Sequence, residues 1–347
     1  MIRDFINKVV LFPYYFTLAF RHFLYNNSFI KSHKPAVPVI SLGNITAGGT
    51  GKTPHTEFFI KNLAPDYKIG VLSRGYGRKT KGFRIVETGD SPLDCGDEPL
   101  QIKKKFPDIL VAVDENRNRG IEMLLSLFPE KRPDIIILDD AFQHRRIIPD
   151  INILLIDYNR PISKDKLIPF GRLRDLPSRI KKADVIIITK CPGEPDIEEQ
   201  QMLRMREGIR DYQSLYFSLI EYGEPLPVFE EADKRYAYSK FAIVLTAIAN
   251  PTPLYYFVRN SNKIINDKLE FSDHHNFRKL DVLRINRWAA NHPKCGIYTT
   301  EKDAQRLLRL SKLSDEVKRR MFYVPIEVKV LNESGCESII TQVKKKL

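Results

Sequence analysis

Short apolar segments alternate along the first two thirds of the chain with longer segments of mixed character. The apolar segments are rich in Ile, Val and Leu, which is typical of parallel strands that are covered on both faces. They lie at 37–43, 68–72, 109–113, 134–138, 151–156 and 184–189. Helices are predicted between several of them, for example at 55–63 and 119–127. This alternation predicts an α/β fold with a doubly wound, mostly parallel sheet.

A polar and charged stretch at 221–240 interrupts the alternation and is the best candidate for a domain boundary. Further α/β elements follow it. They are strands at 241–247, near Ile264 and at 296–299, and a helix at 278–291. We therefore expect an N-terminal segment, a core and a smaller C-terminal α/β lobe, with a cleft between core and lobe; the three parts span 1–35, 36–220 and 221–347.

The N-terminal segment contains an uncharged run at 9–20 that is dense in aromatic residues and flanked by Lys8 and Arg21. A transmembrane helix needs about 20 apolar residues, so this run is too short to span a bilayer. A signal peptide would be followed by a small-residue cleavage site, and here Arg21 and His22 follow instead. Aromatic rings beside cations favour a helical segment that lies in the membrane interface. The alternative is a buried N-terminal helix, broken near Pro13 and packed on the core. The two interpretations are compatible.

Composition narrows the class of protein further. The chain has 347 residues and a formal net charge of +13, which suits a polyanionic partner or an anionic membrane surface. Its four cysteines are far apart and form no C-x-x-C pair, which excludes a common zinc motif and fits a reducing compartment. Hydrophobic residues make up 43% of the chain, enough to supply a core.

The strongest motif joins the first predicted strand to the first predicted helix of the core. It is the octet Thr46-Ala47-Gly48-Gly49-Thr50-Gly51-Lys52-Thr53. A strand, a glycine-rich turn and a helix N-terminus gather backbone N–H groups and the positive end of a helix dipole at one point. Lys52 would reach the β- and γ-phosphates, and the Thr53 hydroxyl would bind Mg²⁺. Apart from Thr46, which replaces the usual first glycine, the octet is a P-loop and predicts binding of a nucleoside triphosphate.

A second motif follows the strand at 134–138, where Asp139 and Asp140 end an aliphatic run. An acidic residue at this position of a P-loop sheet holds the Mg²⁺ shell, directly or through water. We expect this role for one of the two carboxylates, and the pattern does not distinguish them. The cluster His144, Arg145 and Arg146 that follows could contact phosphate oxygens.

Six blocks in this order resemble the tetraacyldisaccharide 4′-kinases of the lipid A pathway. They are VISLGNITAGGTGKTP at 39–54, LSRGYGR at 72–78, GDEP at 96–99, DDAFQHRR at 139–146, FSDHH at 271–275 and TEKDA at 300–304. The order and approximate spacing match over nearly the whole chain, and the family's P-loop also begins with a small residue, as at Thr46. Two departures concern loops: Ala141 stands where the family has Gly, and 169–174 approximates its Pro-x-Gly-x-Leu-Arg.

The resemblance implies that the protein transfers a phosphoryl group from ATP, with Mg²⁺, to the 4′-hydroxyl of a tetraacylated disaccharide 1-phosphate. The implied partners are this lipid-linked substrate and the anionic lipid surface of the inner membrane. The resemblance places the protein at the cytoplasmic face of that membrane, bound peripherally or monotopically. Neither a nucleic acid nor an obligate protein partner is implied.

The resemblance also implies roles for individual residues. The nucleotide would lie on 46–54, including Pro54. Asp97 would accept the proton of the sugar hydroxyl, with Glu98 near the metal. His274 would set the basicity of Asp97 if the C-terminal lobe folds over the P-loop, and His275 is the less favoured partner. The candidates for contacting substrate or phosphate are Arg74, Tyr76, Arg78, Arg117, Arg172 and Arg174.

Two other classes of protein are alternatives to this interpretation. A regulatory GTPase is suggested by Thr189-Lys190-Cys191-Pro192, which resembles the guanine-reading [Asn/Thr]-Lys-x-Asp, but Pro192 replaces the Asp that pairs with guanine. A nucleic-acid-dependent ATPase is suggested by the positive charge alone. It leaves the aromatic N-terminus unexplained, so the kinase is the interpretation that accounts for most of the chain.

Overall fold

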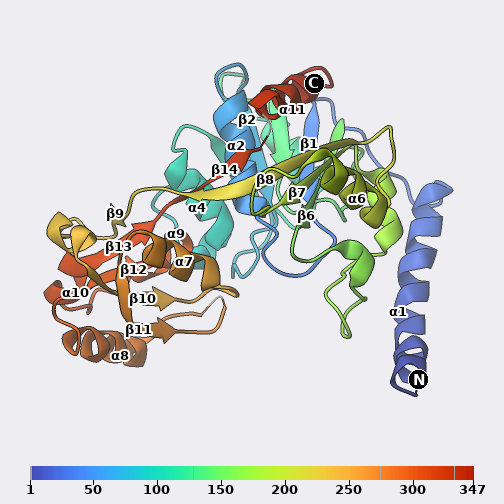
Figure 1. The fold of residues 1–347 in the computed structure, drawn as a ribbon. Helices are drawn as coiled ribbons and strands as arrows, with labels where there is room; N and C mark the ends of the chain where they lie inside the picture. The colour runs from blue at the N-terminus through green and yellow to red at the C-terminus, as the bar shows by residue number, and fades with distance from the viewer. Residues whose placement is uncertain (1, 128, 274, 332) are drawn as a thin grey trace. The chain divides into compact units, whose positions relative to one another are not determined.

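A computed structural model describes residues 2–127, 129–273, 275–331 and 333–347, which form two compact units (Figure 1). Unit 1 consists of Met1–Ile220 and Val328–Leu347, and unit 2 consists of Glu221–Glu327. The chain enters unit 2 along strand β8 (Ser214–Tyr222) and returns to unit 1 along strand β14 (Ile326–Val330).

The strands of unit 1 form one sheet in the order β14-β8-β7-β6-β1-β5-β2-β4-β3. Neighbours from β8 to β4 pair in parallel, and β3 runs antiparallel to β4. The strands are β1 Val39–Gly43, β2 Ile69–Ser73, β3 Arg84–Ile85, β4 Leu110–Val113, β5 Ile135–Leu138, β6 Ile151–Asp157, β7 Val185–Thr189, β8 Ser214–Tyr222 and β14 Ile326–Val330. The predicted doubly wound, mostly parallel sheet is confirmed.

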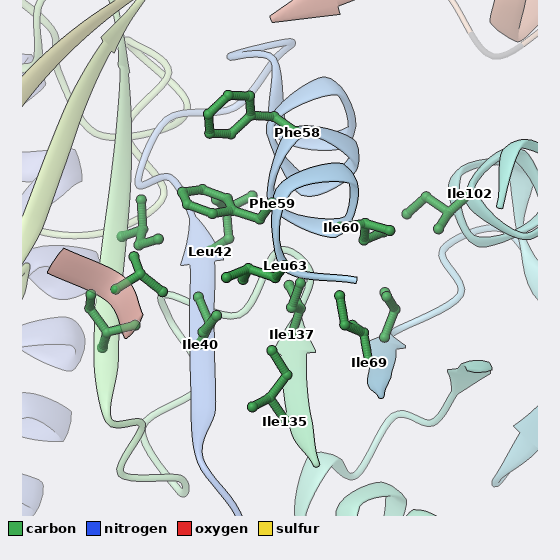
Figure 2. Close-up of a cluster of buried hydrophobic side chains, with 14 of the residues drawn as sticks. Ile40, Leu42, Phe58, Phe59, Ile60, Leu63, Ile69, Ile102, Ile135 and Ile137 are labelled. Atoms are coloured by element: carbon green, nitrogen blue, oxygen red, sulfur yellow. The ribbon is translucent and has the colours of Figure 1, made fainter. Parts of the chain in front are cut away.

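The helices of unit 1 are α1 Ile2–Asn26, α2 Lys52–Leu63, α3 Pro92–Cys95, α4 Asp97–Lys105, α5 Arg117–Leu125, α6 Ile197–Glu207 and α11 Glu333–Lys344, with 3₁₀ turns at Ile162–Lys164 and Pro177–Lys182. Of these, α2, α5 and α6 connect parallel strands, which need such crossovers. Figure 2 shows α2 lying against the sheet, with its apolar side chains in a buried cluster with those of β1, β2 and β5. Each fully buried Phe, Ile or Leu stabilises the fold by about 1.5–3 kcal/mol. The helix that follows the P-loop is therefore firmly anchored.

Helix α1 is continuous through Pro13, so the break suggested by the sequence does not occur. Proline removes a backbone donor and normally kinks a helix. Here the second half of α1 is held by contacts to the loop at 174–175 of the same unit. The Tyr14 hydroxyl donates to the carbonyl of Arg174 (3.1 Å), and His22 Nε2 lies 2.5 Å from Asp175 Oδ1. In the part of the chain that the structure describes, no helix has both the length and the hydropathy needed to cross a membrane.

Unit 2 has its own sheet, in the order β11-β10-β12-β13-β9, parallel except for β9. Its strands are β9 Leu226–Pro227, β10 Phe241–Thr246, β11 Ile264–Glu270, β12 Gly296–Thr300 and β13 Met321–Val324. Its helices are α7 Thr252–Asn260, α8 Lys279–Ala290, α9 Glu301–Leu307 and α10 Asp315–Arg320, with a 3₁₀ turn at Lys234–Tyr238.

The C-terminal end of the chain differs from the sequence prediction, which placed 221–347 in one lobe. Residues 328–347 belong to unit 1. Strand β14 lies beside β8, and Leu331 donates its N–H to the carbonyl of Phe217 (3.0 Å). Helix α11 adds Ile339, Ile340 and Val343 to the cluster that contains α2. The burial of these three side chains explains why the chain returns.

Candidate active site at the P-loop

The glycine-rich loop between β1 and α2 is shaped by two left-handed residues. Gly48 has φ of 108° and Gly51 has φ of 87°, a region that favours glycine. Gly51 immediately precedes the first turn of α2, so the N–H groups of Lys52 and Thr53 lie at a helix N-terminus. Asn44 Nδ2 donates to Thr50 Oγ1 at 2.6 Å and joins the two ends of the loop.

A distant segment braces the P-loop from outside. The N–H of Ala47 donates to the carbonyl of Arg172 (2.6 Å), and the N–H of Arg174 donates to the carbonyl of Ile45 (2.8 Å). The Arg174 guanidinium donates to Asn44 Oδ1 and to Asp140 Oδ1 (3.1 Å). The side chain of Arg172 is exposed. Arg174 therefore positions the loop and reaches one of its acidic neighbours.

Asp139 follows β5 and is completely buried. Thr56 Oγ1 of α2 donates to its Oδ1 at 3.1 Å. Burial, followed by the charges of Glu98 and Asp140, raises the pKa of Asp139 to about 7. A carboxyl group in this position is stabilised in its charged form by a nearby cation.

Asp140 has a different environment. Its Oδ2 lies 3.7 Å from Lys52 Nζ, and its Oδ1 accepts the bond from Arg174. Burial acts to raise the pKa of Asp140, but Lys52 and Arg174 together hold it below its usual value. The carboxylate is therefore already neutralised by two protein cations.

The predicted Mg²⁺ ligands fit a cation that also binds phosphate. Thr53 is buried at the start of α2, and Glu98 is close enough for its charge to affect Asp139. Among the residues that the structure describes, no group of three acidic, His or Cys side chains could hold a metal by itself. Mg²⁺ usually keeps several waters and takes one or two carboxylates plus phosphate oxygens. A bound cation would offset the repulsion that the charges of Glu98 and Asp140 exert on the carboxyl group of Asp139.

A positive cluster lies beside these carboxylates. Arg117, at the start of α5, is buried, and its guanidinium donates to the carbonyl of Asp114 (3.0 Å). Burial lowers the pKa of Arg117 to about 10, and the nearby charge of Asp139 opposes this. Burial and then Arg117 lower the pKa of His144 to about 4, so this ring is neutral near pH 7. Within the described residues, Arg117 Nε and His144 Nε2 have no hydrogen-bond partner. The cluster can therefore accept an anion.

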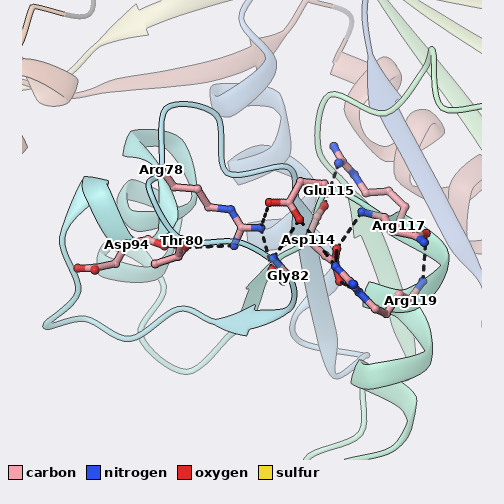
Figure 3. Close-up of polar contacts among 9 residues, drawn as sticks. Arg78, Thr80, Gly82, Asp94, Asp114, Glu115, Arg117 and Arg119 are labelled. Atoms are coloured by element: carbon pink, nitrogen blue, oxygen red, sulfur yellow. Dashed lines mark hydrogen bonds and ion pairs between the residues drawn. The ribbon is translucent and has the colours of Figure 1, made fainter.

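The side chains of the loop after β2 differ in their exposure to solvent. Arg74 is exposed, and Tyr76 is 79% exposed. Arg78 is turned inward and donates to Glu115 Oε1 (2.6 Å) and to the carbonyl of Gly82 (2.7 Å), as Figure 3 shows. Its side chain is only 2% exposed. Arg78 holds the loop in shape, whereas Arg74 and Tyr76 face solvent.

Asp97 is the first residue of α4 and is half-buried. The preceding Gly96 has φ of 95°, and a Cβ on it would lie 3.0 Å from the carbonyl oxygen of Tyr76. The glycine thus allows the loop after β2 to approach the start of α4. The N-terminus of a helix also favours the charged form of Asp97.

The predicted histidine partner of Asp97 cannot be placed, because His274 lies outside the described residues. The contacts of His275 lie within unit 2. Its Nε2 lies 2.9 Å from Asp281 Oδ2, and its ring packs beside Phe271 and Phe277. The structure therefore gives His275 a role in its own unit.

Sequence reasoning missed a buried histidine behind the P-loop. His55 Nδ1 lies 2.7 Å from the Gly51 carbonyl, and its Nε2 lies 2.9 Å from Ser218 Oγ of β8. Since a carbonyl only accepts, Nδ1 carries the proton and Nε2 accepts from the serine. Burial lowers the pKa of His55 to about 4, so it stays neutral. No local pattern signals this contact, because Ser218 is 163 positions away.

The fold and the site together define a P-loop nucleotide-binding protein. In a parallel sheet, a glycine-rich loop follows β1, a lysine begins the next helix, and an acidic pair ends the adjacent β5. Within that class, residues 8–345 match the family model of the tetraacyldisaccharide-1-P 4′-kinases. The chain belongs to this family.

Individual relatives agree with the family match. The chain is 41% identical over 317 residues to the tetraacyldisaccharide 4′-kinase of Porphyromonas gingivalis, covering 90% of this chain and 88% of the relative. It is 42% identical over 319 residues to that of Phocaeicola vulgatus, with 90% and 87% coverage. The crystal structure of LpxK from Aquifex aeolicus in complex with ATP matches with a TM-score of 0.74 and 28% identity, over 97% of this chain and 99% of that one.

The activity follows from family membership. The protein is an ATP-dependent kinase that phosphorylates the 4′-hydroxyl of tetraacyldisaccharide 1-phosphate in lipid A biosynthesis. Its substrate is a lipid A precursor.

Proposed function

We propose that residues 46–54 hold the triphosphate of ATP, with the ammonium of Lys52 on the β- and γ-phosphates. The left-handed glycines and the start of α2 support this role, because they direct backbone N–H groups to one point. Thr53 and Asp139 would bind the Mg²⁺ shell, with Glu98 and Asp140 in its surroundings. The buried carboxyl group of Asp139, which follows β5 and accepts from Thr56 of α2, is the observation that carries the metal assignment. The bound cation neutralises charge that develops on the transferred phosphoryl group.

Asp97 takes the proton from the 4′-hydroxyl as that oxygen attacks the γ-phosphate. Phosphoryl transfer depends mainly on positioning and charge stabilisation, so the base needs a fixed place and an ionised carboxyl. Its place at the start of α4 supports both requirements.

Side chains around the P-loop and the loop after β2 are proposed to contact the anionic parts of the reactants. Arg117 and Arg174 are proposed to contact phosphate on the nucleotide side. Arg74, Tyr76 and Arg172, whose side chains are exposed, are proposed to contact the substrate. Arg78 supports substrate binding indirectly by holding the loop, because its guanidinium is already engaged with Glu115.

Helix α1 docks the enzyme on the cytoplasmic face of the inner membrane, peripherally or monotopically. Phe12, Phe16 and Phe20 recur at four-residue spacing and are each more than half exposed. Their rings stack at 6.3 and 6.2 Å and form an apolar stripe. Such a stripe on a basic protein suits insertion among anionic headgroups.

The reaction is tested with purified protein, Mg-ATP and tetraacyldisaccharide 1-phosphate in mixed micelles. Asp97→Ala is expected to lower kcat at least 100-fold while ATP binding is retained. The matched control, Asp108→Ala, removes an exposed carboxylate near the other end of α4 and should keep normal activity. Equal activity in both variants would disprove the assignment of Asp97 as the base.

Membrane docking is tested by flotation with vesicles that contain an anionic lipid. The triple variant F12S/F16S/F20S should lose binding and show a raised KM for the lipid, with unchanged ATP affinity. Tyr212→Ser, at a residue that is 71% exposed on unit 1, is the control. Unchanged flotation of the triple variant would exclude the stripe as the docking surface.

A further inference from the structure

Two helices of unit 1 begin at the site. Helix α2 starts directly after the P-loop, with Lys52 and Thr53 in its first turn. Helix α4 starts at Asp97, and the next residue, Glu98, is close enough to the end of β5 for its charge to affect Asp139. The proposed base therefore stands on one helix, and the proposed phosphate and metal ligands stand on another. The distance between them depends on how α2 and α4 pack against each other.

The two helices share an apolar contact. Ile60 of α2 and Ile102 of α4 are completely buried in one cluster, and Figure 2 shows their side chains facing each other. Leu100 of α4 belongs to the same cluster. Hydrophobic attraction has no preferred direction. These contacts therefore hold α4 against α2, but a hydrogen bond, which requires a particular distance and angle, is needed to fix its position along the helix axis.

A buried polar contact between the helices provides this directional bond. Glu57 of α2 is only 5% exposed, and its carboxylate accepts from two residues of α4. Gln101 Nε2 donates to Glu57 Oε1 at 2.9 Å, and Lys105 Nζ donates to Glu57 Oε2 at 2.7 Å. Hydrogen bonds to a charged group are stronger and shorter than neutral ones. Because two successive turns of α4 engage both oxygens of one carboxylate, the contact fixes the rotation of α4 as well as its separation from α2.

The spacing along each helix relates this contact to the site. Residues four apart lie on the same face of an α-helix. Glu57 follows Thr53 by four positions on α2, and Gln101 follows Asp97 by four positions on α4. The bond between Glu57 and Gln101 therefore joins the helices one turn beyond Thr53 and Asp97, on the faces that carry them. The start of α4 is thus held toward the start of α2.

We propose that Glu57 is a positioning residue for phosphoryl transfer, which holds Asp97 at a fixed distance from the P-loop through Gln101 and Lys105. This role rests on the proposed function of Asp97 as the base. A base must lie within hydrogen-bond reach of the hydroxyl group that attacks. A misplacement of about 1 Å lowers the rate about 100-fold. Glu57 acts through Asp97 and needs no contact of its own with nucleotide or substrate.

Steady-state kinetics of Glu57→Leu test this role, because leucine removes the polar contact and keeps an apolar side chain against α4. We expect kcat to fall at least about tenfold. The KM for Mg-ATP should stay unchanged, since α2 remains anchored in the apolar cluster. Glu57→Gln can still accept from Gln101 and should retain most of kcat. Lys61→Leu, at an exposed residue of α2, is the control and should match the unaltered enzyme.

A double-mutant cycle distinguishes positioning of the base from general support of the fold. In the Asp97→Ala background, Glu57→Leu should cause no further fall in the residual kcat, because the group that it positions is absent. An equal fall in both backgrounds would overturn the proposal, and so would an unchanged kcat in Glu57→Leu alone. Normal activity of Asp97→Ala by itself would show instead that the assignment of the base is wrong, which leaves Glu57 with no base to position.

A second variant separates the rate from stability. Glu57→Leu leaves the buried amide of Gln101 without its acceptor, which destabilises the fold. The double variant Glu57→Leu/Gln101→Leu removes both polar groups, so its melting temperature should lie closer to that of the unaltered enzyme. Its kcat should stay at least about tenfold lower, because an apolar pair does not fix the position of α4 along the helix axis. Recovery of kcat together with the melting temperature would show that Glu57 only stabilises the fold, and the proposal would be wrong.

Discussion

Asp139 and Asp140 are adjacent in the sequence, yet their carboxyl groups have opposite pKa shifts. Burial and the charges of Glu98 and Asp140 raise the pKa of Asp139 to about 7. Partial burial acts to raise the pKa of Asp140, whose side chain is one-third exposed, but Lys52 and Arg174 lower it. The left-handed φ of Asp140, 48°, turns the chain between them. One carboxyl group is thus paired with protein cations, and the other is left for a bound cation.

Binding of Mg-ATP is predicted to release a proton from Asp139 at pH 6.5. A group with a pKa of about 7 is mostly protonated at this pH, and a cation beside it favours the charged form. Calorimetry in two buffers with different ionisation enthalpies measures the released proton. Asp139→Asn should abolish this release, whereas Asp140→Asn should preserve most of it. Equal release from Asp139→Asn and the unaltered protein would contradict the assignment.

The ligand-free enzyme is predicted to become more stable at pH 8 when Asp139 is replaced by Asn. The pKa of Asp139 in the folded protein lies above its ordinary value. The protonated carboxyl group therefore contributes fully to the free energy of unfolding below about pH 4, and this contribution is lost as pH rises through about 7. Asparagine avoids the buried charge and can still accept from Thr56. Thermal unfolding at pH 8 and pH 5 tests this. The stabilisation should be larger at pH 8, and a difference that does not change with pH would argue against a titrating Asp139.

His55 is predicted to make the enzyme sensitive to acid. Burial lowers the pKa of His55 from 6.5 to about 4. The neutral imidazole therefore contributes fully to the free energy of unfolding above pH 6.5, and this contribution is lost as pH falls toward 4. At pH 5 the loss amounts to about 2 kcal/mol of unfolding free energy. His55→Leu should therefore be destabilised at pH 7.5, and the deficit should narrow at pH 5 in urea unfolding.

Ser218→Ala is the matched control for His55, since it removes the partner hydroxyl and keeps the imidazole. Its unfolding free energy should be lower at both pH values, with the pH dependence of the unaltered protein. If His55→Leu shows that same pH dependence, a different group is responsible for the acid sensitivity.

Substitutions of the two arginines in the loop after β2 are predicted to affect different properties of the enzyme. Arg78→Met removes a buried guanidinium together with its bonds to Glu115 and to the Gly82 carbonyl, and should lower the melting temperature by several degrees. Arg74→Met, at an exposed side chain, should raise the KM for the lipid with little change in melting temperature. Differential scanning fluorimetry and micelle kinetics measure both quantities. A higher KM without lower stability in Arg78→Met would restore Arg78 as a direct substrate ligand.

Several parts of this protein were predictable because their signals are contiguous in the chain. The central strands are aliphatic runs, and burial on both faces of a parallel sheet requires that composition. The P-loop is a strand, a turn and a helix start within residues 39–54, so its geometry depends on neighbouring residues. The acidic pair at 139–140 was recognised because it directly ends such a strand.

Other features depend on residues that are distant in the sequence. The sequence placed Arg78 with the substrate ligands, and its pairing with Glu115 required two loops to meet. The return of 328–347 to unit 1 depends on burial of α11 in the cluster that contains α2 and on the pairing of β14 with β8, which has no continuous aliphatic run.

The sequence by itself determined the sheet type, the phosphate loop and the family, because local composition and motif order carry that information. Tertiary structure alone decided which of Asp139 and Asp140 has the raised pKa, that His55 is neutral, and that Lys190 is fastened to Gly49. Those properties arise from burial and from charges that belong to other strands. Only folding brings such groups within interaction distance.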